Sequence, residues 1–198
     1  MANTNNFKIK SLYQNDVDKM VELQQIILDE VKEKGKEGLF RENTRGMFEL
    51  CVQSPNHSVG IFDGDKMIAL GILFDGLGTD EDLSTDLVKH DVRGKVSRRY
   101  KSTDLKDKTI QHISANMKLT LVHPDYRGMG LQIILLNKLE ALAKFFGYTH
   151  LCCTISPDNA PSISNVEKCG YEFDHKALKY GGLTRNIYVK EINGSYMY

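Results

Sequence analysis

The most informative stretch of the chain is Leu121-Val-His-Pro-Asp-Tyr-Arg-Gly-Met-Gly-Leu-Gln132, which places two glycines between a predicted strand and a predicted helix. Residues 113–122 form an apolar run typical of a strand, and apolar residues recur at helical spacing from 131 to 146. Glycines at such a turn let the backbone approach a ligand closely. The first amides of the helix are unpaired and carry the positive end of its dipole, so the turn suits a phosphate or pyrophosphate.

Two other nucleotide-binding motifs do not fit this turn. A P-loop needs Gly-Lys-Ser/Thr, which does not follow these glycines. A Rossmann fingerprint needs a third glycine and follows the first strand, whereas this turn comes late in the chain. A tight turn that only packs the helix against the strand stays open as the alternative to a ligand site.

The elements around this turn predict a mixed α/β fold. Alternating apolar residues, helical apolar stripes and a hairpin signal at Asp63-Gly-Asp65 give the order β-αα-ββ-insert-β-α-β-α-ββ. We expect a single domain over residues 1–198, with a polar insert at about 75–111. The predicted strands cover 7–12, 58–62, 66–74, 113–122, 149–155, 170–173 and 186–190, and the predicted helices cover about 17–31, 43–51, 131–146 and 159–168.

Composition and charge exclude several classes of protein. Hydrophobic residues make up 41% and charged residues 26% of the chain, which is typical of a globular protein. Lys plus Arg and Asp plus Glu each number 26, which argues against a globally basic surface for nucleic acid. We find no apolar run of membrane-spanning length and no signal peptide, so we expect a cytoplasmic protein that binds neither nucleic acid nor membrane. The four cysteines form no zinc-ligand pattern, so we expect no metal site.

Two motifs, with the order and spacing of that family's signatures, resemble the GNAT superfamily of N-acetyltransferases. Residues 121–132 are similar to that family's acetyl-CoA signature, Arg/Gln-x-x-Gly-x-Gly/Ala after a strand. Asn159-Ala-Pro-Ser-Ile-Ser-Asn-Val-Glu-Lys-Cys-Gly-Tyr171 is similar to its second signature, in which Asn opens a helix closed by Lys-x-Gly-Phe/Tyr. Over residues 7–192 the resemblance implies a central mixed, mostly antiparallel sheet flanked by helices.

The resemblance also implies a site for acetyl-CoA as co-substrate. Backbone amides of residues 127–132 would cradle its pyrophosphate, and strand 119–122 would splay from the next strand to leave a slot for the pantetheine arm. Amides near Leu121 and Val122 would hold the thioester carbonyl and stabilise the oxyanion as an amine attacks. The residues implied to bind acetyl-CoA are Leu121, Val122, Arg127, Gly128, Met129, Gly130, Leu131, Gln132, Asn159 and Ser162.

Three positions depart from the family pattern. Gln132 replaces the last small residue of the first signature, and Val166 stands where some members carry a tyrosine general acid. Between residues 109 and 122 there is no Asp or Glu to act as a base. His112 is the candidate catalytic base because histidine titrates near neutral pH, and proton loss through a water chain is the alternative.

The predicted function is transfer of acetyl from acetyl-CoA to a primary amine by direct attack, without a covalent enzyme intermediate. A non-catalytic acyl-CoA-binding or sensing module on the same fold is the alternative. The acceptor partner is a small-molecule or peptide amine. We expect the insert at 75–111 to select it, and an open sheet edge at the C-terminal strands would allow a homodimer.

Overall fold

The computed structural model of the protein describes residues 7–53, 57–75, 91–92, 95–96 and 114–192. Its helices are α1 (Val17–Glu33), α2 (Arg45–Cys51), α4 (Leu131–Phe145) and α5 (Ala160–Lys168), with short 3-10 turns η2 (Gln14–Asp16) and η3 (Pro124–Tyr126). Its strands are β1 (Lys8–Ser11), β2 (His57–Asp63), β3 (Lys66–Asp75), β4 (Asp91–Val92), β5 (Lys95–Val96), β6 (Ser114–Val122), β7 (His150–Ile155), β8 (Glu172–Lys179) and β9 (Leu183–Glu191).

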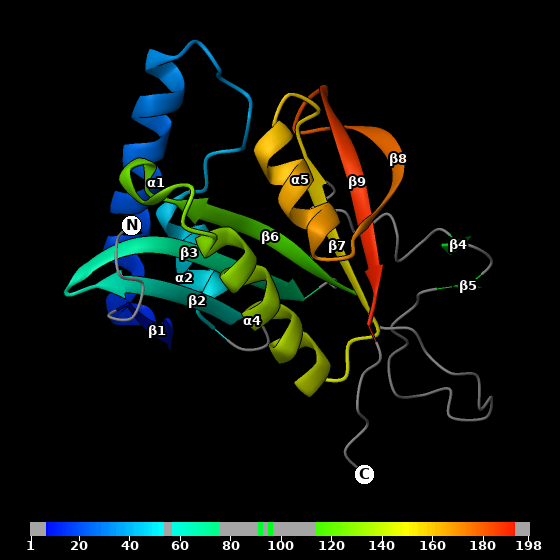
Figure 1. Cartoon of the computed structure of the whole chain (residues 1–198), viewed down its shortest axis with the longest axis horizontal. Helices are drawn as coiled ribbons and strands as arrows, with labels where there is room; N and C mark the ends of the chain where they lie inside the picture. Colours follow the sequence, from blue (N-terminus) through cyan, green and yellow to red (C-terminus); the bar gives the residue numbers. More distant parts are fainter. Residues whose placement is uncertain (1–6, 54–56, 76–90, 93–94, 97–113, 193–198) are drawn as a thin grey trace.

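Seven of these strands form one sheet in the order β1-β2-β3-β6-β7-β9-β8 (Figure 1). All neighbours pair antiparallel except β6 and β7, which run parallel. Strands β4 and β5 form a separate antiparallel pair. The predicted mixed, mostly antiparallel sheet flanked by helices is therefore confirmed.

The helices cover the sheet from both sides. Buried side chains of α1 and α2, such as Leu23 and Phe48, pack with one face of the sheet. Buried side chains of α4 and α5, such as Leu135 and Val166, pack with the other. Burying a large apolar side chain of this kind stabilises the fold by about 1.5–3 kcal/mol. Two cores thus hold the central strands between two layers of helix (Figure 1).

Local signals account for several element boundaries. Asp63 pairs with Lys66 across the predicted hairpin, where Gly64 has a φ of +56°. The Thr44 side chain accepts a hydrogen bond from the Met47 N–H and so caps α2. Gly147, at φ +78°, follows the end of α4. These turns and caps lie where the sequence predicts them.

Three features differ from the prediction. Phe145 completes the apolar stripe of α4 in the sequence, but its side chain is 63% exposed at the end of that helix. Ile9 is also exposed, because β1 is an edge strand with its outer face in solvent. Strands β8 and β9 run well beyond the predicted 170–173 and 186–190. The edge strand β8 is largely exposed, so polar residues continue it and the apolar pattern does not reveal its length.

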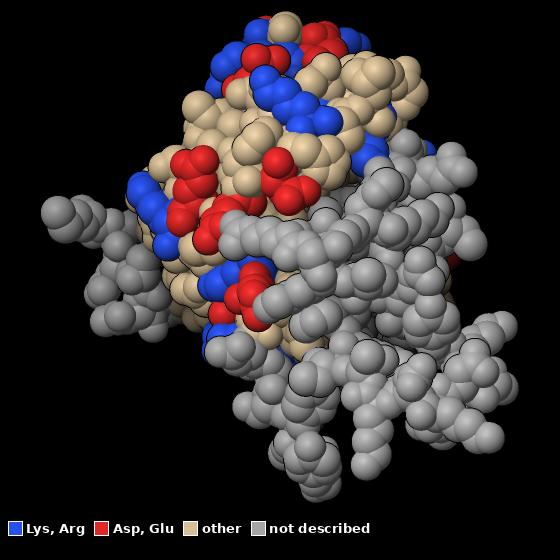
Figure 2. Space-filling model, turned by 90° about the vertical axis from the view of Figure 1, so that its right-hand side faces the viewer, with Lys and Arg blue, Asp and Glu red and all other residues tan. Residues whose placement is uncertain are grey.

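The surface carries charges of both signs. Figure 2 shows Lys and Arg interspersed with Asp and Glu over the described part of this face, consistent with equal numbers of the two in the sequence. None of the helices that the structure describes is long and apolar enough to cross a membrane.

Candidate functional site

The parallel strands β6 and β7 separate after a short paired segment. Pairing with β7 covers only residues 114–116 of β6. Directly after it, the register of β6 with β3 shifts, which leaves Lys118 as the extra residue of a β-bulge. A bulge bends its strand and increases the local twist, which turns the rest of β6 away from β7. The predicted splay of residues 119–122 is confirmed.

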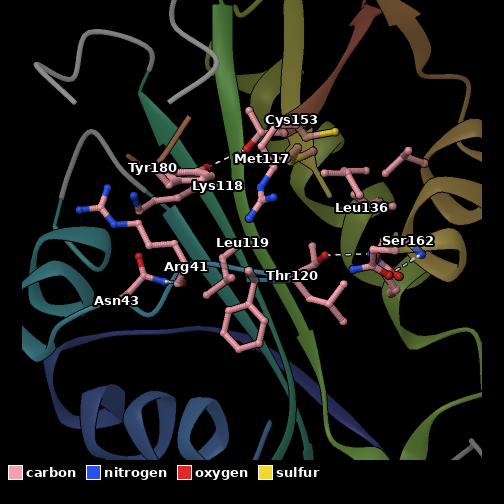
Figure 3. Close-up of a pocket in the computed structure, with 18 residues that line it drawn as sticks. Arg41, Asn43, Met117, Lys118, Leu119, Thr120, Leu136, Cys153, Ser162 and Tyr180 are labelled. Atoms are coloured by element: carbon pink, nitrogen blue, oxygen red, sulfur yellow. Dashed lines mark hydrogen bonds between the residues drawn. The ribbon is translucent and has the colours of Figure 1, made fainter. Parts of the chain in front are cut away.

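A pocket of about 100 Å³ occupies this split. Its walls come from elements on both faces of the sheet, so the pocket reaches the gap in the sheet from either side (Figure 3). Charged lining residues are few, and among the residues that the structure describes none of them is Asp, Glu or His. The lining comprises Leu39, Phe40, Arg41 and Asn43 after α1, residues 117–120 of β6, Gln132 and Leu136 of α4, residues 153–155 of β7, Asn159, Ser162 and Val166 at α5, and Tyr180 and Arg185 around the β8–β9 turn.

The two-glycine turn opens α4 beside the split. Gly128 and Gly130 have φ values of +78° and +75°, a region that L side chains rarely adopt. Gly130 is the N-cap of α4, and no side chain caps the first amides of this helix. Open space lies where a Cβ of either glycine would project. The turn therefore leaves backbone N–H groups accessible to an anion at a helix N-terminus, which fits the pyrophosphate of coenzyme A.

Three further predicted residues of the turn anchor it. Met129 is half-buried against the core under α4, and Leu131 is fully buried there. Arg127 makes a two-point ion pair with Glu30 of α1, at 2.7 Å from Nη1 and 2.5 Å from Nη2. This hydrogen bonding lowers the pKa of the Glu30 carboxyl. Arg127 thus fastens the turn to α1 as well as placing a cation beside it.

Gln132 links three elements inside the pocket. Its Nε2 donates to Thr120 Oγ1 of β6 at 3.0 Å and lies 3.4 Å from Ser162 Oγ of α5. Its Oε1 accepts from Asn165 Nδ2 at 2.7 Å. Asn159 caps α5, since its Oδ1 accepts the Ser162 N–H at 3.3 Å. The structure thus brings Gln132, Asn159 and Ser162 together, as the sequence predicts.

The register of β6 determines which of its amides face the split. The His123 N–H donates to the Ile68 carbonyl of β3, and paired residues alternate between the two sides of a strand. The backbone groups of Leu121 therefore point to β3, while those of Thr120 and Val122 point toward the β7 side. Leu121 itself is buried against α1, and neither Leu121 nor Val122 lines the pocket.

At the opposite end of the pocket, two arginines lie near the aromatic ring of Tyr180. The Tyr180 hydroxyl bonds to Thr154 Oγ1 at 2.8 Å, and the Arg185 and Arg41 guanidinium carbons lie 5.3 and 5.7 Å from its ring centre. Tyr180 has a φ of +55°, a strained value for a non-glycine residue. Arg185 Nη2 donates to the Gly38 carbonyl, so the β8–β9 turn is tied to the chain after α1.

Cys153 is the cysteine that lines the pocket. Burial raises the pKa of its thiol to about 12, so it remains protonated at neutral pH. A protonated thiol is a poor nucleophile, and the pocket therefore offers no activated cysteine for a covalent acyl intermediate.

The candidate acid and base positions are only partly visible. His112 lies outside the described residues, as does most of the insert at 75–111. Val166 lines the pocket and is buried, so the position of the family's tyrosine is apolar here. His123 is a structural residue: its Nδ1 accepts the Asp125 N–H, and burial, with Lys66 nearby, lowers the pKa of its ring.

The sequence analysis did not predict the end of the pocket around Tyr180. None of the sequence motifs described above includes Arg41, Thr154, Tyr180 or Arg185. The one local signal is the Tyr180-Gly-Gly182 turn, whose glycines also have positive φ values. The interactions that gather these side chains join segments far apart in the chain.

Comparison with known families identifies part of the chain. Residues 111–171 match the family model of the acetyltransferase (GNAT) family. None of the curated proteins searched matches the chain.

Solved structures match almost the whole chain. The ribosomal-protein-S18-alanine N-acetyltransferase of Escherichia coli aligns with a TM-score of 0.62 and 17% identity, over 97% of this chain and 99% of its own. Arabidopsis thaliana NAA60 in complex with acetyl-CoA aligns at 0.65 and 14%, over 95% and 99%. Salmonella typhimurium yncA, a putative acetyltransferase with acetyl-CoA, aligns at 0.62 and 14%, over 98% of each chain.

These findings confirm the resemblance to the GNAT superfamily. The chain has the GNAT fold, and residues 111–171, which match the family model, span β6, the glycine turn, α4, β7 and α5.

Proposed function

We propose that the protein transfers acetyl from acetyl-CoA to a primary amine by direct attack. The observation that carries this proposal is the pocket in the β6–β7 split, which is reached from both faces of the sheet and lies beside a free helix N-terminus. Two substrates can then meet within the sheet, one entering from the α4 side and the other from the side of α1.

The residues of the chain divide into two groups around this meeting point. Of the predicted amides of residues 127–132, those of 128–132 bind the pyrophosphate, because the Arg127 N–H already donates to the Pro124 carbonyl. Asn159 and Ser162 contact the pantetheine arm. The N–H groups of Val122 and Thr120 face the split and hold the thioester carbonyl. Such fixed donors stabilise the negative charge that develops on that oxygen during attack. As the new N–C bond forms, the C–S bond breaks and the coenzyme A sulfur takes up a proton.

The amine must also lose a proton. We propose His112 as the base, because it lies two residues before the start of β6 in the sequence and the ordinary pKa of histidine lies near neutrality. Water in the pocket is the alternative route, since direct attack by an amine does not require a dedicated base.

A non-catalytic acyl-CoA sensor is the second candidate function. It is favoured by the chemistry of the pocket, which among the described residues lacks Asp, Glu and His and has Val166 at the family's tyrosine position. Both functions require coenzyme A binding, and only the enzyme releases free thiol.

The test is to mix the protein with acetyl-CoA and a panel of primary amines and to follow thiol release and acetylated product. Thiol that appears in step with acetylated amine supports the enzyme. Calorimetric binding of acetyl-CoA with no product from any amine would support the sensor instead.

A further inference from the structure

Arg185 is a buried guanidinium without an acidic partner in the described structure. The residue is 3% exposed and lines the pocket. Its Nη1 donates to the Thr184 carbonyl at 2.9 Å, and its Nη2 donates to the Gly38 carbonyl. A guanidinium has five N–H donors, so these two bonds leave three of them unused. Charged groups buried in this way normally pair with an opposite charge.

The surroundings of Arg185 do not neutralise it. Burial lowers its pKa, but an arginine in a protein stays charged. The charge of Asp158 favours the charged form, although Asp158 is exposed and does not line the pocket. The other charged residues that line the pocket are Arg41 and Lys118, and both are cations. The described wall is therefore positive.

The cations gather at one end of the pocket. Arg41 and Arg185 both approach the ring of Tyr180, and Lys118 lies beside Tyr180 in Figure 3. Ser162 lies at the other end, next to α5 (Figure 3), and Gln132 Nε2 is 3.4 Å from its Oγ. The glycine turn does not line the pocket at all. The phosphates of coenzyme A, bound at that turn, would leave the buried Arg185 without an oxyanion partner.

We propose that the acceptor is a primary amine that also carries an oxyanion, a carboxylate or a phosphate, and that Arg185 binds this group together with Arg41. The inference rests on the proposed function and assigns its substrate class. The planar fork of a guanidinium matches the two oxygens of such a group, and the buried setting strengthens the pairing. Anchoring the anion near Tyr180 would direct the amine toward the split.

The experiment compares acceptor amines that carry an oxyanion with related amines that do not. Initial rates are measured for amino acids against their C-terminal amides, and for aminoethylphosphonate against ethylamine. We expect the wild type to prefer the anionic member of each pair, and the comparison of carboxylate with phosphonate identifies which oxyanion fits. In Arg185→Gln and Arg41→Gln, kcat/KM for the anionic amine should fall by about tenfold or more, with little change for the neutral amine. Arg45→Gln, an exposed arginine of α2 outside the pocket, is the matched control.

A second readout does not depend on turnover. With coenzyme A present, calorimetry of N-acetylated amino acids against N-acetylated amino-acid amides reports binding at the acceptor end. Tighter binding of the acids than of the amides, lost in Arg185→Gln, supports the inference. It does so even if no amine is acetylated, because the absence of acetylation would count only against the proposed function. Equal use and equal binding of both series would overturn it. A matching loss of coenzyme A affinity in Arg185→Gln would overturn it too, because the anion would then belong to coenzyme A. If Arg185→Gln does not fold, the exposed Arg41→Gln and the wild-type preference decide.

Discussion

Arg127 and Glu30 form a two-point ion pair that joins the glycine turn to α1, although 97 residues separate them in the sequence. The pair gives Arg127 a role in positioning the turn, in addition to any contact with a phosphate. Glu30 also accepts from Lys34 one helical turn further along, so its carboxylate holds two cations.

This pair predicts a pH-dependent contribution to stability. Because hydrogen bonding to Arg127 lowers the pKa of Glu30 in the folded protein, the stabilisation is present above the ordinary value of 4.5 and is lost as pH falls below it. Glu30→Gln should lower the free energy of unfolding by about 1 kcal/mol at neutral pH and by much less in acid. Urea denaturation at several pH values measures this, with the exposed Glu33→Gln of the same helix as control. A difference between wild type and Glu30→Gln that does not change with pH would contradict the account.

Truncation of the Gln132 side chain should increase the affinity for coenzyme A. Its side chain connects β6 with α5 across the slot proposed for the pantetheine arm, so binding must displace some of these hydrogen bonds. Replacing it by alanine removes that cost, and a net hydrogen bond of about 0.5–1.5 kcal/mol corresponds to roughly a 2- to 10-fold tighter Kd for coenzyme A. Calorimetry checks this, with Asn137→Ala on the exposed face of α4 as control. Weaker binding would instead make Gln132 a direct ligand.

The protonated thiol of Cys153 predicts that acetyl passes directly from acetyl-CoA to the amine. Since its thiol stays protonated, Cys153→Ala should keep kcat within about twofold, and no acetylated protein should accumulate with acetyl-CoA alone. Intact-protein mass spectrometry detects such an adduct. An acetyl group on Cys153 that disappears when amine is added would show a covalent pathway and refute direct attack.

The role of base that we propose for His112 predicts the shape of the pH–rate profile. If it is the base, His112→Ala should lower kcat, leave the KM for acetyl-CoA unchanged and remove an ionisation near neutral pH. His175→Ala, a half-buried histidine of the edge strand β8 outside the pocket, should keep the wild-type profile. An unchanged profile in His112→Ala would leave proton transfer to water.

Local chemistry made the proposed coenzyme A side of the site predictable. The positive φ angles of Gly128 and Gly130, the start of α4 and the cap made by Asn159 all follow from residues next to one another in the sequence. The splay of β6 was implied by the family resemblance, and the bulge at Lys118 supplies its physical cause.

Long-range contacts explain what the sequence did not predict. Arg185 reaches the carbonyl of Gly38, 147 residues earlier, and no periodicity indicates that contact. The same holds for the pairing of Arg127 with Glu30. The acceptor end of the pocket is built from such contacts, so its positive charge becomes visible only when the chain is folded.

The central claim is that the glycine turn holds acetyl-CoA so that the thioester reaches the β6–β7 split. Titration calorimetry of acetyl-CoA into wild type, Gly130→Val and Gly147→Val tests it most directly. Gly130 and Gly147 begin and follow the same helix with φ values of +75° and +78°, and open space surrounds both, so valine imposes similar backbone strain at either position. The account predicts binding of one acetyl-CoA per wild-type chain, retained in Gly147→Val and lost in Gly130→Val, where the backbone can no longer approach the pyrophosphate. Undiminished affinity in a folded Gly130→Val would contradict it.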